Sequence, residues 1–430
     1  MRSARVGELT LALLILLPLA ASGHLAPPGA DPTAMLYWLA RVTGVLALTL
    51  ILLAAILSFR IPGLDRWFGG LTRLWSIHHV LGWAGFVLVL SHVWLVAAGG
   101  LTTSVAAATH RLFPPLDHGA IWAGWAALLA LLVFLAPTFK FFGEPGYARW
   151  KRLHLISAAA LVLALVHALA LAAVAWPWWL FGALALAAIL WRKLLSPRMA
   201  GRYRVEAVDS LGPDLVELQL APVTGTPMAH QAGQFVYLTP QDPTLASGCG
   251  EEHPYTLSSA PGARHLRIGV KALGDATRAL QRVRPGSEVR IEGPYGDFLP
   301  RHPQPRPVLW VGAGIGITPF VGAVRAMAER GESPHPSVRL VYAVNTRGDA
   351  HFADELEALA ANLPNLSLAI HERNASGLLD AAWLRDQCPD LERHEVWICG
   401  PAPFDRHLRA ILRAQGVPRR RIHSEAFHLL

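Results

Sequence analysis

The sequence predicts three parts with different folds: a membrane α-helical bundle of six spans (residues 1–197), an antiparallel β-barrel (198–302) and an α/β domain with a parallel sheet (303–430). With 430 residues, 53% of them hydrophobic, and a mean hydropathy of +0.35, the chain is too apolar to be wholly soluble. Apolar residues concentrate before about residue 196, and charge and proline return beyond it. Short β-type runs follow residue 200, and strand and helix patterns alternate after residue 307.

The first span has two interpretations. Residues 1–23 begin with basic residues, continue with a short apolar core and end in small residues, so they fit a cleaved signal peptide as well as a membrane helix. We favour an uncleaved helix. About 20 apolar residues are needed to cross a bilayer, and five further segments approach or exceed that length: residues 35–58, 74–98, 119–139, 153–175 and 177–195.

Basic residues between the spans predict the orientation. One side carries Arg2, Arg5, Arg60, Arg66, Arg73, Lys140, Arg149, Lys151, Arg152, Arg192 and Lys193, whereas the other carries only Arg111. Because cytoplasmic loops are the basic ones, we expect the N-terminus and everything after residue 196 in the cytoplasm. The basic residues beside the spans, which set the orientation, therefore account for the net charge of +8. The sequence contains no basic–aromatic module for binding nucleic acid.

Histidines lie inside two of the apolar segments. His78, His79 and His92 fall within residues 74–98, and ionisable groups at membrane depth favour a functional interpretation because they are costly there. The fourteen residues between His78 and His92 correspond to a helical rise of about 21 Å, with both side chains within roughly 40° of one face. His78 fits this face better than its neighbour His79.

A second segment repeats the arrangement with His154 and His167. Two helices that each offer one imidazole near either membrane surface can hold two stacked haems by bis-histidine ligation. The alternative, histidines acting as hydrogen-bonding polar glue between helices, is disfavoured by two matched pairs. The thirteen-residue step leaves His167 roughly 140° around an ideal helix from His154, so that helix must twist, bulge or use different flanks.

The outer end of the bundle has further polar residues. Arg41 either snorkels toward lipid head groups or pairs with the propionates of an outer haem. Residues 99–118, with His110 and at their end His118, are long enough to cap that haem.

The three cysteines exclude several cofactors. Cys249, Cys388 and Cys399 lie far apart, without CxxC, CxxCH or a four-cysteine cluster, so covalent haem, iron–sulfur and structural zinc are unsupported. The odd count disfavours disulfides and suits a reducing cytoplasm.

Two sets of strands are expected in the second half. The barrel strands are Y203-R-V-E-A-V-D, L215-V-E-L-Q-L, F235-V-Y-L, Y255-T-L-S, L266-R-I-G-V and V289-R-I-E, separated by turn residues. The strands of the parallel sheet begin at residues 307, 338, 366 and 395, with helices beginning near 318, 351, 380 and 403.

A glycine-rich turn follows the first strand of the parallel sheet. In V311-G-A-G-I-G-I-T-P-F320, residues Gly312, Gly314, Gly316 and Thr318 lead into a helix, which is typical of a site for a dinucleotide pyrophosphate. C399-G400-P401 ends another strand of the same sheet. Cys399 is either a small buried residue or, as we favour, lines the place where a nicotinamide meets a flavin, beside Gly400 and Pro401.

The segment H253-P-Y-T-L-S-S lies on a barrel strand, where an aromatic ring can stack on a flavin and hydroxyls can bond its edge. It resembles the flavin signature of the NADPH oxidase and ferric reductase family, a membrane branch of the ferredoxin–NADP reductase-like flavoproteins. G233-Q-F, V270-K-A-L-G-D-A-T277, E292-G-P-Y-G-D-F298, the glycine-rich turn and C399-G-P match in order, and the histidine pairs, with H78-H-V-L-G-W and W150-K-R-L-H, match its transmembrane domain. The resemblance covers roughly residues 35–428.

This resemblance implies site residues. Tyr255, Thr256 and Ser258 would hold the flavin ring and ribityl chain, and His253, Gly274, Asp275 and Thr277 would surround the diphosphate. Phe427 would stack on the flavin face that the nicotinamide must displace, or else it packs in the last strand. Three residues follow Phe427, whereas the family pattern commonly ends at or near this aromatic.

The charged residues after one strand of the parallel sheet bear on the choice between NADPH and NADH. After V341-Y-A-V comes N345-T-R347, without an immediate acidic residue for a ribose 2′-hydroxyl. Arg347, with Arg373 as a second candidate, could meet a 2′-phosphate, so NADPH is favoured and NADH is possible.

The expected function is electron transfer across a bacterial cytoplasmic membrane. NADPH reduces FAD in the cytoplasm, and two haem b groups, held by His78 with His154 and His92 with His167, lead to an outer acceptor. Dioxygen, giving superoxide, is the favoured acceptor. The alternatives are a ferric chelate and another membrane or periplasmic protein. The oligomeric state is left open by the sequence.

Overall fold

A computed structural model describes residues 2–60, 64–136, 147–300, 304–331 and 337–426. The chain divides into two compact units, Met1–Leu195 and Ser196–Leu430. The boundary expected between residues 302 and 303, and Phe427, both lie outside the described residues.

The first unit is helical. Asp31 caps α2 by accepting a hydrogen bond from the backbone N of Ala34 at 2.8 Å, and Pro32 takes the first helical position, where its missing N–H costs nothing. The helices are α1 (Arg2–Ala21), α2 (Pro32–Ser58), α3 (Leu64–Phe68), α4 (Leu71–Leu101), α5 (Val105–Leu112), α6 (Gly119–Leu135), α7 (Tyr147–His154), α8 (Ile156–Leu171) and α9 (Trp176–Leu190), with a π-helical turn at Trp191–Leu195.

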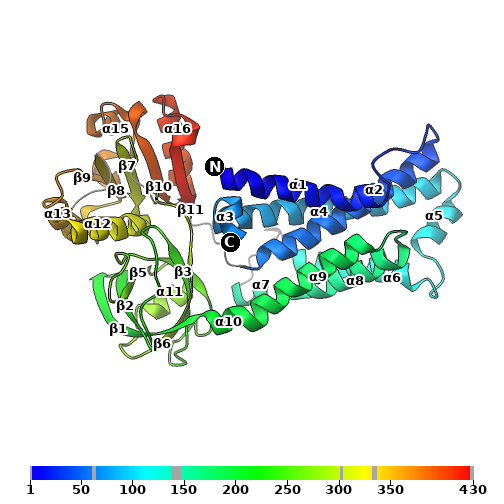
Figure 1. Ribbon diagram of the computed structural model, residues 1–430, viewed down its shortest axis with the longest axis horizontal. Coiled ribbons are helices and arrows are strands. Elements are labelled where there is room, and N and C mark those ends of the chain that lie inside the picture. The colour runs from blue at the N-terminus through cyan, green and yellow to red at the C-terminus, as the bar shows by residue number, and fades with distance from the viewer. Residues whose placement is uncertain (1, 61–63, 137–146, 301–303, 332–336, 427–430) are drawn as a thin grey trace. The chain divides into compact units, whose positions relative to one another are not determined.

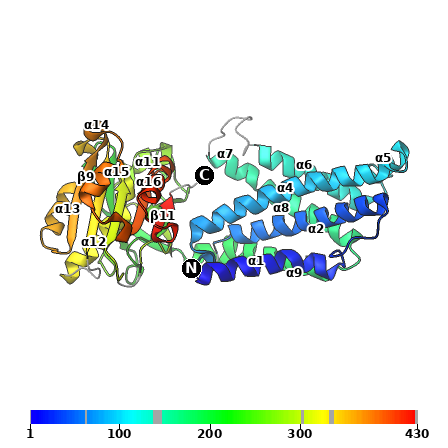
Figure 2. The same ribbon diagram turned by 90° about the horizontal axis from the view of Figure 1, so that it is seen from above.

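Two helix pairs dominate the packing of this unit. Helix α2 lies along α4, and α6 lies along α8 (Figures 1 and 2). Glycines bring the first pair together: a Cβ added at Gly85 would lie 2.6 Å from the Ile51 side chain, and one at Gly99 would lie 2.7 Å from the Tyr37 ring. Small residues at helix contacts are typical of membrane bundles.

Among the described residues, three helices are long and apolar enough to cross a membrane: Pro32–Ser58, Leu71–Leu101 and Arg152–Leu171. Val6–Ala21, Gly119–Leu135 and Trp176–Leu190 are apolar but shorter. The expected segment 119–139 runs into residues outside the described part of the chain. Six spans therefore stay a prediction.

The second unit begins with α10 (Ser196–Met199) and an antiparallel sheet. Its six strands have the order β4-β3-β6-β1-β2-β5. A bridge between Leu257 and Ile268 links the two edges, so the sheet curls toward closure. The elements are β1 (Gly201–Gly212), β2 (Leu215–Pro222), β3 (Phe235–Pro240), β4 (His253–Thr256), β5 (Leu266–Lys271), α11 (Asp275–Leu280) and β6 (Glu288–Tyr295).

A five-stranded parallel sheet follows, in the order β11-β10-β7-β8-β9. The antiparallel-then-parallel order expected from the sequence is confirmed. The elements are β7 (Val308–Ala313), α12 (Thr318–Arg330), β8 (Val338–Val344), α13 (Ala353–Ala360), β9 (Leu366–Glu372), α14 (Arg373–Ser376), α15 (Ala381–Gln387), β10 (Glu395–Gly400), α16 (Ala402–Ala414) and β11 (Ile422–Ala426).

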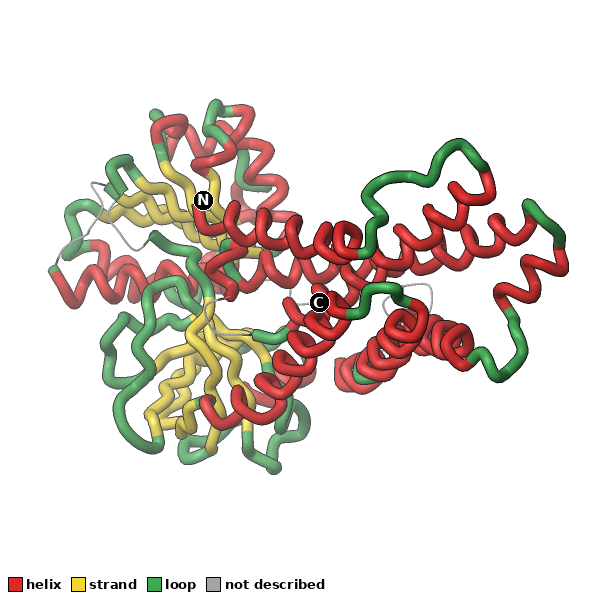
Figure 3. Tube along the Cα trace, turned by 45° about the vertical axis from the view of Figure 1, so that its right-hand side comes forward, coloured by secondary structure: helices red, strands yellow, loops and turns green. Residues whose placement is uncertain are grey.

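The two sheets share part of one core. Leu215 and Phe298, from the antiparallel part, pack in the same buried cluster as Trp310 and Phe320 of the parallel part. Helix α12 lies between the sheets (Figures 1 and 3).

Candidate functional site

The four expected ligand histidines form two facing pairs. The rings of His78 on α4 and His154 at the end of α7 have centroids 6.5 Å apart. The rings of His92 on α4 and His167 on α8 have centroids 6.3 Å apart. Helix α4 thus presents His78 and His92 to the segment that carries His154 and His167.

Backbone carbonyls orient three of these rings. Nδ1 of His78 donates to the Ala54 carbonyl at 2.7 Å, Nδ1 of His92 to Ala40 at 2.7 Å, and Nδ1 of His167 to Ala120 at 2.8 Å. A carbonyl only accepts, so Nδ1 carries the proton and Nε2 keeps its lone pair free for a metal.

His154 is held differently. Its ring stacks on Trp150 at 5.0 Å and meets the edge of Phe134 at 5.3 Å. Its Nδ1 is buried and has no hydrogen-bond partner among the described residues. A buried polar atom without a partner is costly, which is consistent with a site that is completed by a bound group.

The gap between the paired rings is wide enough to hold a metal ion. No hydrogen bond joins the two rings of either pair within the described residues. Metal–nitrogen bonds of about 2 Å on both sides of one ion place the two ring centres about 6 Å apart, which matches both pairs. The residues present therefore fit two bis-histidine haems.

Two glycines make room for the imidazoles of His92 and His167. A Cβ added at Gly44 would lie 2.8 Å from Nδ1 of His92, and one at Gly124 would lie 2.7 Å from Nδ1 of His167. Each glycine follows, by four residues, the alanine whose carbonyl accepts that Nδ1: Ala40 and Ala120. Sequence reasoning missed these small residues, although the A-x-x-x-G spacing facing a buried histidine is a readable signal.

A local break accounts for the thirteen-residue step between His154 and His167. Helix α7 ends at His154 and α8 begins at Ile156. At Leu155 the bonds tighten to three-residue spacing: its N–H bonds to Arg152 O at 3.2 Å, and its carbonyl accepts from Ala158 N at 3.1 Å. A tighter turn rotates further per residue, so it brings the two histidines toward one face.

The other polar residues that the sequence singled out in the bundle are exposed. His79 is exposed, with its ring 5.5 Å from that of His78, and the ring that pairs with His154 is the one of His78. Arg41 is exposed and follows Ala40 on α2, and its role stays a prediction. His110 and His118 are exposed, His118 beside Asp117 at 3.0 Å.

The expected flavin residues lie on β4. Tyr255 packs in the core of the antiparallel sheet, and its buried hydroxyl has no hydrogen-bond partner among the described residues. Burial raises the pKa of this phenol, so it stays a donor. Thr256 pairs with Phe235 on the other face of the strand. His253 Nε2 lies 3.5 Å from Glu251.

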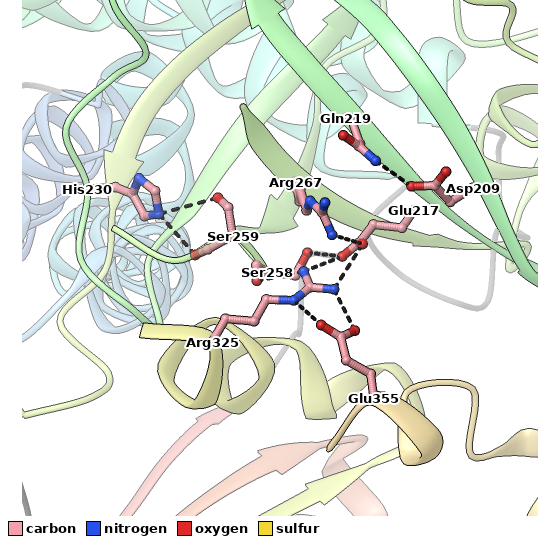
Figure 4. A network of polar contacts seen from close by, with 9 residues as sticks. All are labelled: Asp209, Glu217, Gln219, His230, Ser258, Ser259, Arg267, Arg325 and Glu355. Atoms are coloured by element: carbon pink, nitrogen blue, oxygen red, sulfur yellow. Dashed lines mark hydrogen bonds and ion pairs between the residues drawn. The ribbon is translucent and has the colours of Figure 1, made fainter. Parts of the chain in front are cut away.

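The expected flavin contact of Ser258 stays a prediction. Its side chain is fully buried, and Oγ donates to Oε1 of Glu217 at 2.6 Å (Figure 4). Glu217 is itself only 2% exposed, and a buried carboxylate requires donors. The Ser258 hydroxyl is therefore one of the donors that this carboxylate requires.

The residues expected at the diphosphate form a turn at the start of α11, and their side chains make hydrogen bonds within that turn. Oγ1 of Thr277 accepts hydrogen bonds from the backbone N atoms of Leu273, at 2.9 Å, and Gly274, at 2.8 Å. Oδ1 of Asp275 accepts from Ala276 N at 2.9 Å, which lowers the pKa of this carboxyl. Because an ionised carboxylate repels a diphosphate, Asp275 suits a role in holding the turn better than one in direct contact.

The glycine-rich turn has the shape that its sequence predicts. It runs from β7 through the 3-10 turn Gly314–Ile317 to Thr318, the first residue of α12. A Cβ at Gly312 would lie 2.8 Å from Ile317 Cα, and Gly314 has a φ of +56°. A Cβ at Gly316 would collide with the Cys399 carbonyl.

The C399-G-P segment lies against this turn. Cys399 is fully buried and pairs with Gly312 across neighbouring strands. A Cβ at Gly400 would lie 2.8 Å from Ala313 Cβ, and Pro401 leads into α16. Cys399 therefore lies beside the turn, as expected of a residue near the nicotinamide, but its side chain belongs to the core cluster.

Acidic residues from elsewhere in the chain lie around Arg347, whereas the prediction concerned only the residues that follow this strand directly. Glu372, at the end of β9, accepts from Arg347 N at 2.8 Å. The Arg347 guanidinium lies 2.9 Å from Glu357 and 3.3 Å from Asp354. The neighbouring strand supplies Glu372 from 25 positions further along the chain, so inspection of the residues after β8 did not reveal it. Arg373 begins α14 and is exposed.

Comparison with known families assigns all three parts. Residues 43–165 match a family described as the ferric reductase like transmembrane component, residues 201–298 an FAD-binding domain, and residues 310–410 an oxidoreductase NAD-binding domain.

Individual relatives match about half of the chain. An NADPH oxidoreductase of Mycobacterium tuberculosis is 30% identical over 233 residues, 53% of this chain and 60% of the relative. A flavohemoprotein of Bordetella pertussis is 30% identical over 237 residues, 50% of this chain and 57% of the relative. The chain thus spans less than two thirds of these relatives. A flavohemoglobin structure from Malassezia yamatoensis shares the fold, with a TM-score of 0.51, 18% identity and 99% of each chain covered.

These matches and the fold define an oxidoreductase with FAD- and NAD-binding domains joined to a membrane domain. The order of these three matches fits the architecture of the NADPH oxidase and ferric reductase family, which the sequence resembles.

Proposed function

We propose that this protein transfers electrons from cytoplasmic NADPH, through FAD and two b-type haems, to dioxygen at the outer face of a bacterial cytoplasmic membrane, giving superoxide. When bound, FAD accepts a hydride and each haem exchanges single electrons. His78 with His154 would hold the inner haem, and His92 with His167 the outer one. Oligomeric state does not enter the proposal.

The observation that carries this proposal is the geometry of the imidazole pairs. Centroid separations of 6.5 and 6.3 Å suit a bridging iron and are too long for a direct hydrogen bond between rings. His78, His92 and His154 lie within the residues that match the ferric reductase like transmembrane component, and His167 lies two residues beyond them. An FAD-binding and an NAD-binding domain follow in the same chain. The asymmetry of basic residues between the apolar segments supports a cytoplasmic location for that module.

In the FAD- and NAD-binding module, residues of this chain would bind the flavin and the nicotinamide coenzyme and orient them. Tyr255, with its buried and unpartnered hydroxyl, and Thr256 would contact the flavin, while His253, Gly274 and Thr277 would lie at the diphosphate. Gly312, Gly314 and Gly316 would let the backbone approach the nucleotide, with Cys399 beside them. NADPH is preferred in this proposal because of Arg347, and one relative is named an NADPH oxidoreductase.

A ferric chelate is the second candidate acceptor, because the matching family is described as ferric reductase like. Another membrane or periplasmic protein is the third. The bundle offers no acidic chelating cluster among its described outer residues 99–118, which favours a diffusible acceptor.

The test uses the full chain purified in detergent. The proposal requires two haems per chain and NADPH-driven haem reduction that depends on FAD, followed by superoxide dismutase-sensitive reduction of a reporter in air. Reduction of a ferric chelate under anaerobic conditions, without superoxide in air, would favour the second candidate. Absence of a reduced b-type haem spectrum would refute the proposal.

A further inference from the structure

One guanidinium lies between two carboxylates where the two sheets of the second unit meet (Figure 4). Arg325 on α12 donates from Nη1 and Nη2 to both oxygens of Glu217 on β2, at 2.7 and 3.0 Å. It donates from Nε and Nη2 to both oxygens of Glu355 on α13, each at 2.7 Å. Nη1 also donates to the backbone carbonyl of Ser258 at 2.9 Å.

This network is shielded from water on the Glu217 side. The side chains of Glu217 and Arg325 are 3% and 10% exposed, whereas Glu355 is 39% exposed. Burial works against the charged guanidinium, but its hydrogen bonds to Glu355 and Glu217 outweigh burial and raise the pKa of Arg325. The group is therefore charged at every physiological pH, and its bonds are weakly screened by salt.

The network joins the two regions assigned to the cofactors. Ser258 follows the flavin strand β4, which ends at Thr256, and α12 begins at Thr318, where the glycine-rich turn ends. One turn into α12, a Cβ at Gly322 would lie 3.0 Å from the Leu257 carbonyl, so the helix touches this segment closely. Arg325 follows about one turn later and bonds to the same segment.

The two regions also touch directly. A Cβ at Gly269 on β5 would lie 3.1 Å from Ile315 and 3.2 Å from Thr318, both in or at the glycine-rich turn. Gly269 pairs with Glu217 across neighbouring strands. The carboxylate that binds Arg325 thus comes from the strand position that faces the nucleotide turn.

We propose that Arg325 is a positioning residue, which fixes the distance between a nicotinamide bound at the glycine-rich turn and a flavin bound at β4. This inference rests on the proposed function. In that reaction the C4–H bond of the reduced nicotinamide breaks, and a hydride with both electrons passes to flavin N5, leaving oxidised nicotinamide and reduced flavin anion. Reacting atoms must approach to about 3–3.5 Å, and misplacement by about 1 Å costs about 100-fold in rate.

The test compares Arg325→Lys with Arg330→Lys in the full chain in detergent. Lysine keeps the charge at position 325 but cannot form two bidentate pairs. Arg330 ends the same helix and is exposed, so it provides the matched control. In anaerobic stopped-flow experiments at saturating NADPH, we expect roughly tenfold slower flavin reduction in Arg325→Lys, with NADPH affinity changed less than about threefold and a larger isotope effect from C4-deuterated NADPH. Arg330→Lys should match the wild type.

A second readout needs no cofactor. In FAD-free protein, Arg325→Lys should speed amide hydrogen exchange across residues 257–259, because the Ser258 carbonyl loses its Nη1 donor and Glu217 loses its bidentate partner. Among the described residues, Glu217 then keeps only Ser258 Oγ and Arg267 as donors. Arg330→Lys should not change this exchange. Glu355→Gln, at the exposed side of the network, is the milder variant. It should slow hydride transfer to a smaller extent and raise the isotope effect in the same direction.

Wild-type flavin reduction rates and isotope effects in Arg325→Lys would overturn the inference. A fall in the flavin reduction rate that is fully explained by a lower FAD content would also overturn it. If Arg325→Lys does not fold, Glu355→Gln provides the test. An unchanged flavin reduction rate and isotope effect in Glu355→Gln would then overturn the inference. If neither NADPH nor NADH reduces the FAD-loaded wild type, the proposed function fails first and the inference falls with it.

Discussion

Three of the four paired histidines are oriented by a backbone carbonyl. Ala54, Ala40 and Ala120 accept from His78, His92 and His167, so each ring keeps Nε2 free. Loss of such an orienting partner typically costs about 10–100-fold in metal affinity. The identity of the alanine side chain is not what matters here, since its carbonyl makes the contact.

His78 and His79 provide a direct comparison of neighbouring residues. We expect His78→Ala to lose one of two haems, because its ring faces His154. His79→Ala should keep both, because its side chain is exposed. Haem per chain, measured as the pyridine haemochrome, distinguishes them. The reverse pattern would assign the ligand to His79.

Arg347 tests the coenzyme preference. Hydrogen bonds to charged groups contribute about 1.5–3 kcal/mol, so Arg347→Ala should lower kcat/KM for NADPH by roughly tenfold or more and leave that for NADH nearly unchanged. Asp354→Asn with Glu357→Gln should act oppositely, because these carboxylates compete for the guanidinium. Equal effects on both coenzymes would remove Arg347 from the 2′-phosphate site.

At the residue scale, the sequence revealed residue types but not their partners. The paired histidines could be found because ionisable groups in apolar spans are rare. Ser258, Glu217 and Arg325 could not be connected, because Arg325 and Glu217 lie 108 positions apart and side-chain direction depends on packing. Glu372 near Arg347 was missed for the same reason.

At the element scale, α6 offers a matched pair of glycines. A Cβ at Gly124 would lie 2.7 Å from His167 Nδ1, whereas one at Gly119 meets nothing within 4 Å. Gly124→Ala should therefore displace the imidazole and lower outer-haem occupancy, and Gly119→Ala should not. Reduced-minus-oxidised spectra of both variants measure this. Full haem content in Gly124→Ala would mean that α6 can move away without loss of the site.

The glycine-rich turn gives a second prediction for an element. Gly316→Ala would force a collision with the Cys399 carbonyl, and overpacking typically costs about 1–3 kcal/mol. We expect a lower Tm and weaker NADPH binding by calorimetry. Gly348→Ala is the control, because its Cβ would meet only Thr346 Oγ1 at 3.7 Å. Equal behaviour of the two variants would show that the turn tolerates a side chain.

Element types were predictable where periodicity is clear. Helices α12, α13, α15 and α16 begin at residues 318, 353, 381 and 402, within two residues of the starts expected near 318, 351, 380 and 403. The break at Leu155 was not located in advance, although the misfit of thirteen residues required some irregularity there. Its position depends on hydrogen bonds that no residue type in W150-K-R-L-H-L specifies.

At the scale of the whole molecule, the sequence predicted a membrane part followed by two sheets, and the family matches agree with that order. The number of spans stays a prediction, since three helices are long enough and three apolar ones are shorter. Orientation likewise rests on the basic residues beside the spans.

Transfer of electrons from one side of the membrane to the other is the central claim, and sealed vesicles test it most directly. The full chain is inserted with its nucleotide-binding unit outward, NADPH is added outside, and an impermeant electron acceptor is enclosed in the lumen. Reduction of the enclosed acceptor by the wild type, and its loss in His92→Ala or His167→Ala with flavin reduction intact, is the predicted result. Undiminished reduction in these variants, or none in a wild type with its full complement of FAD and haem, would contradict the account.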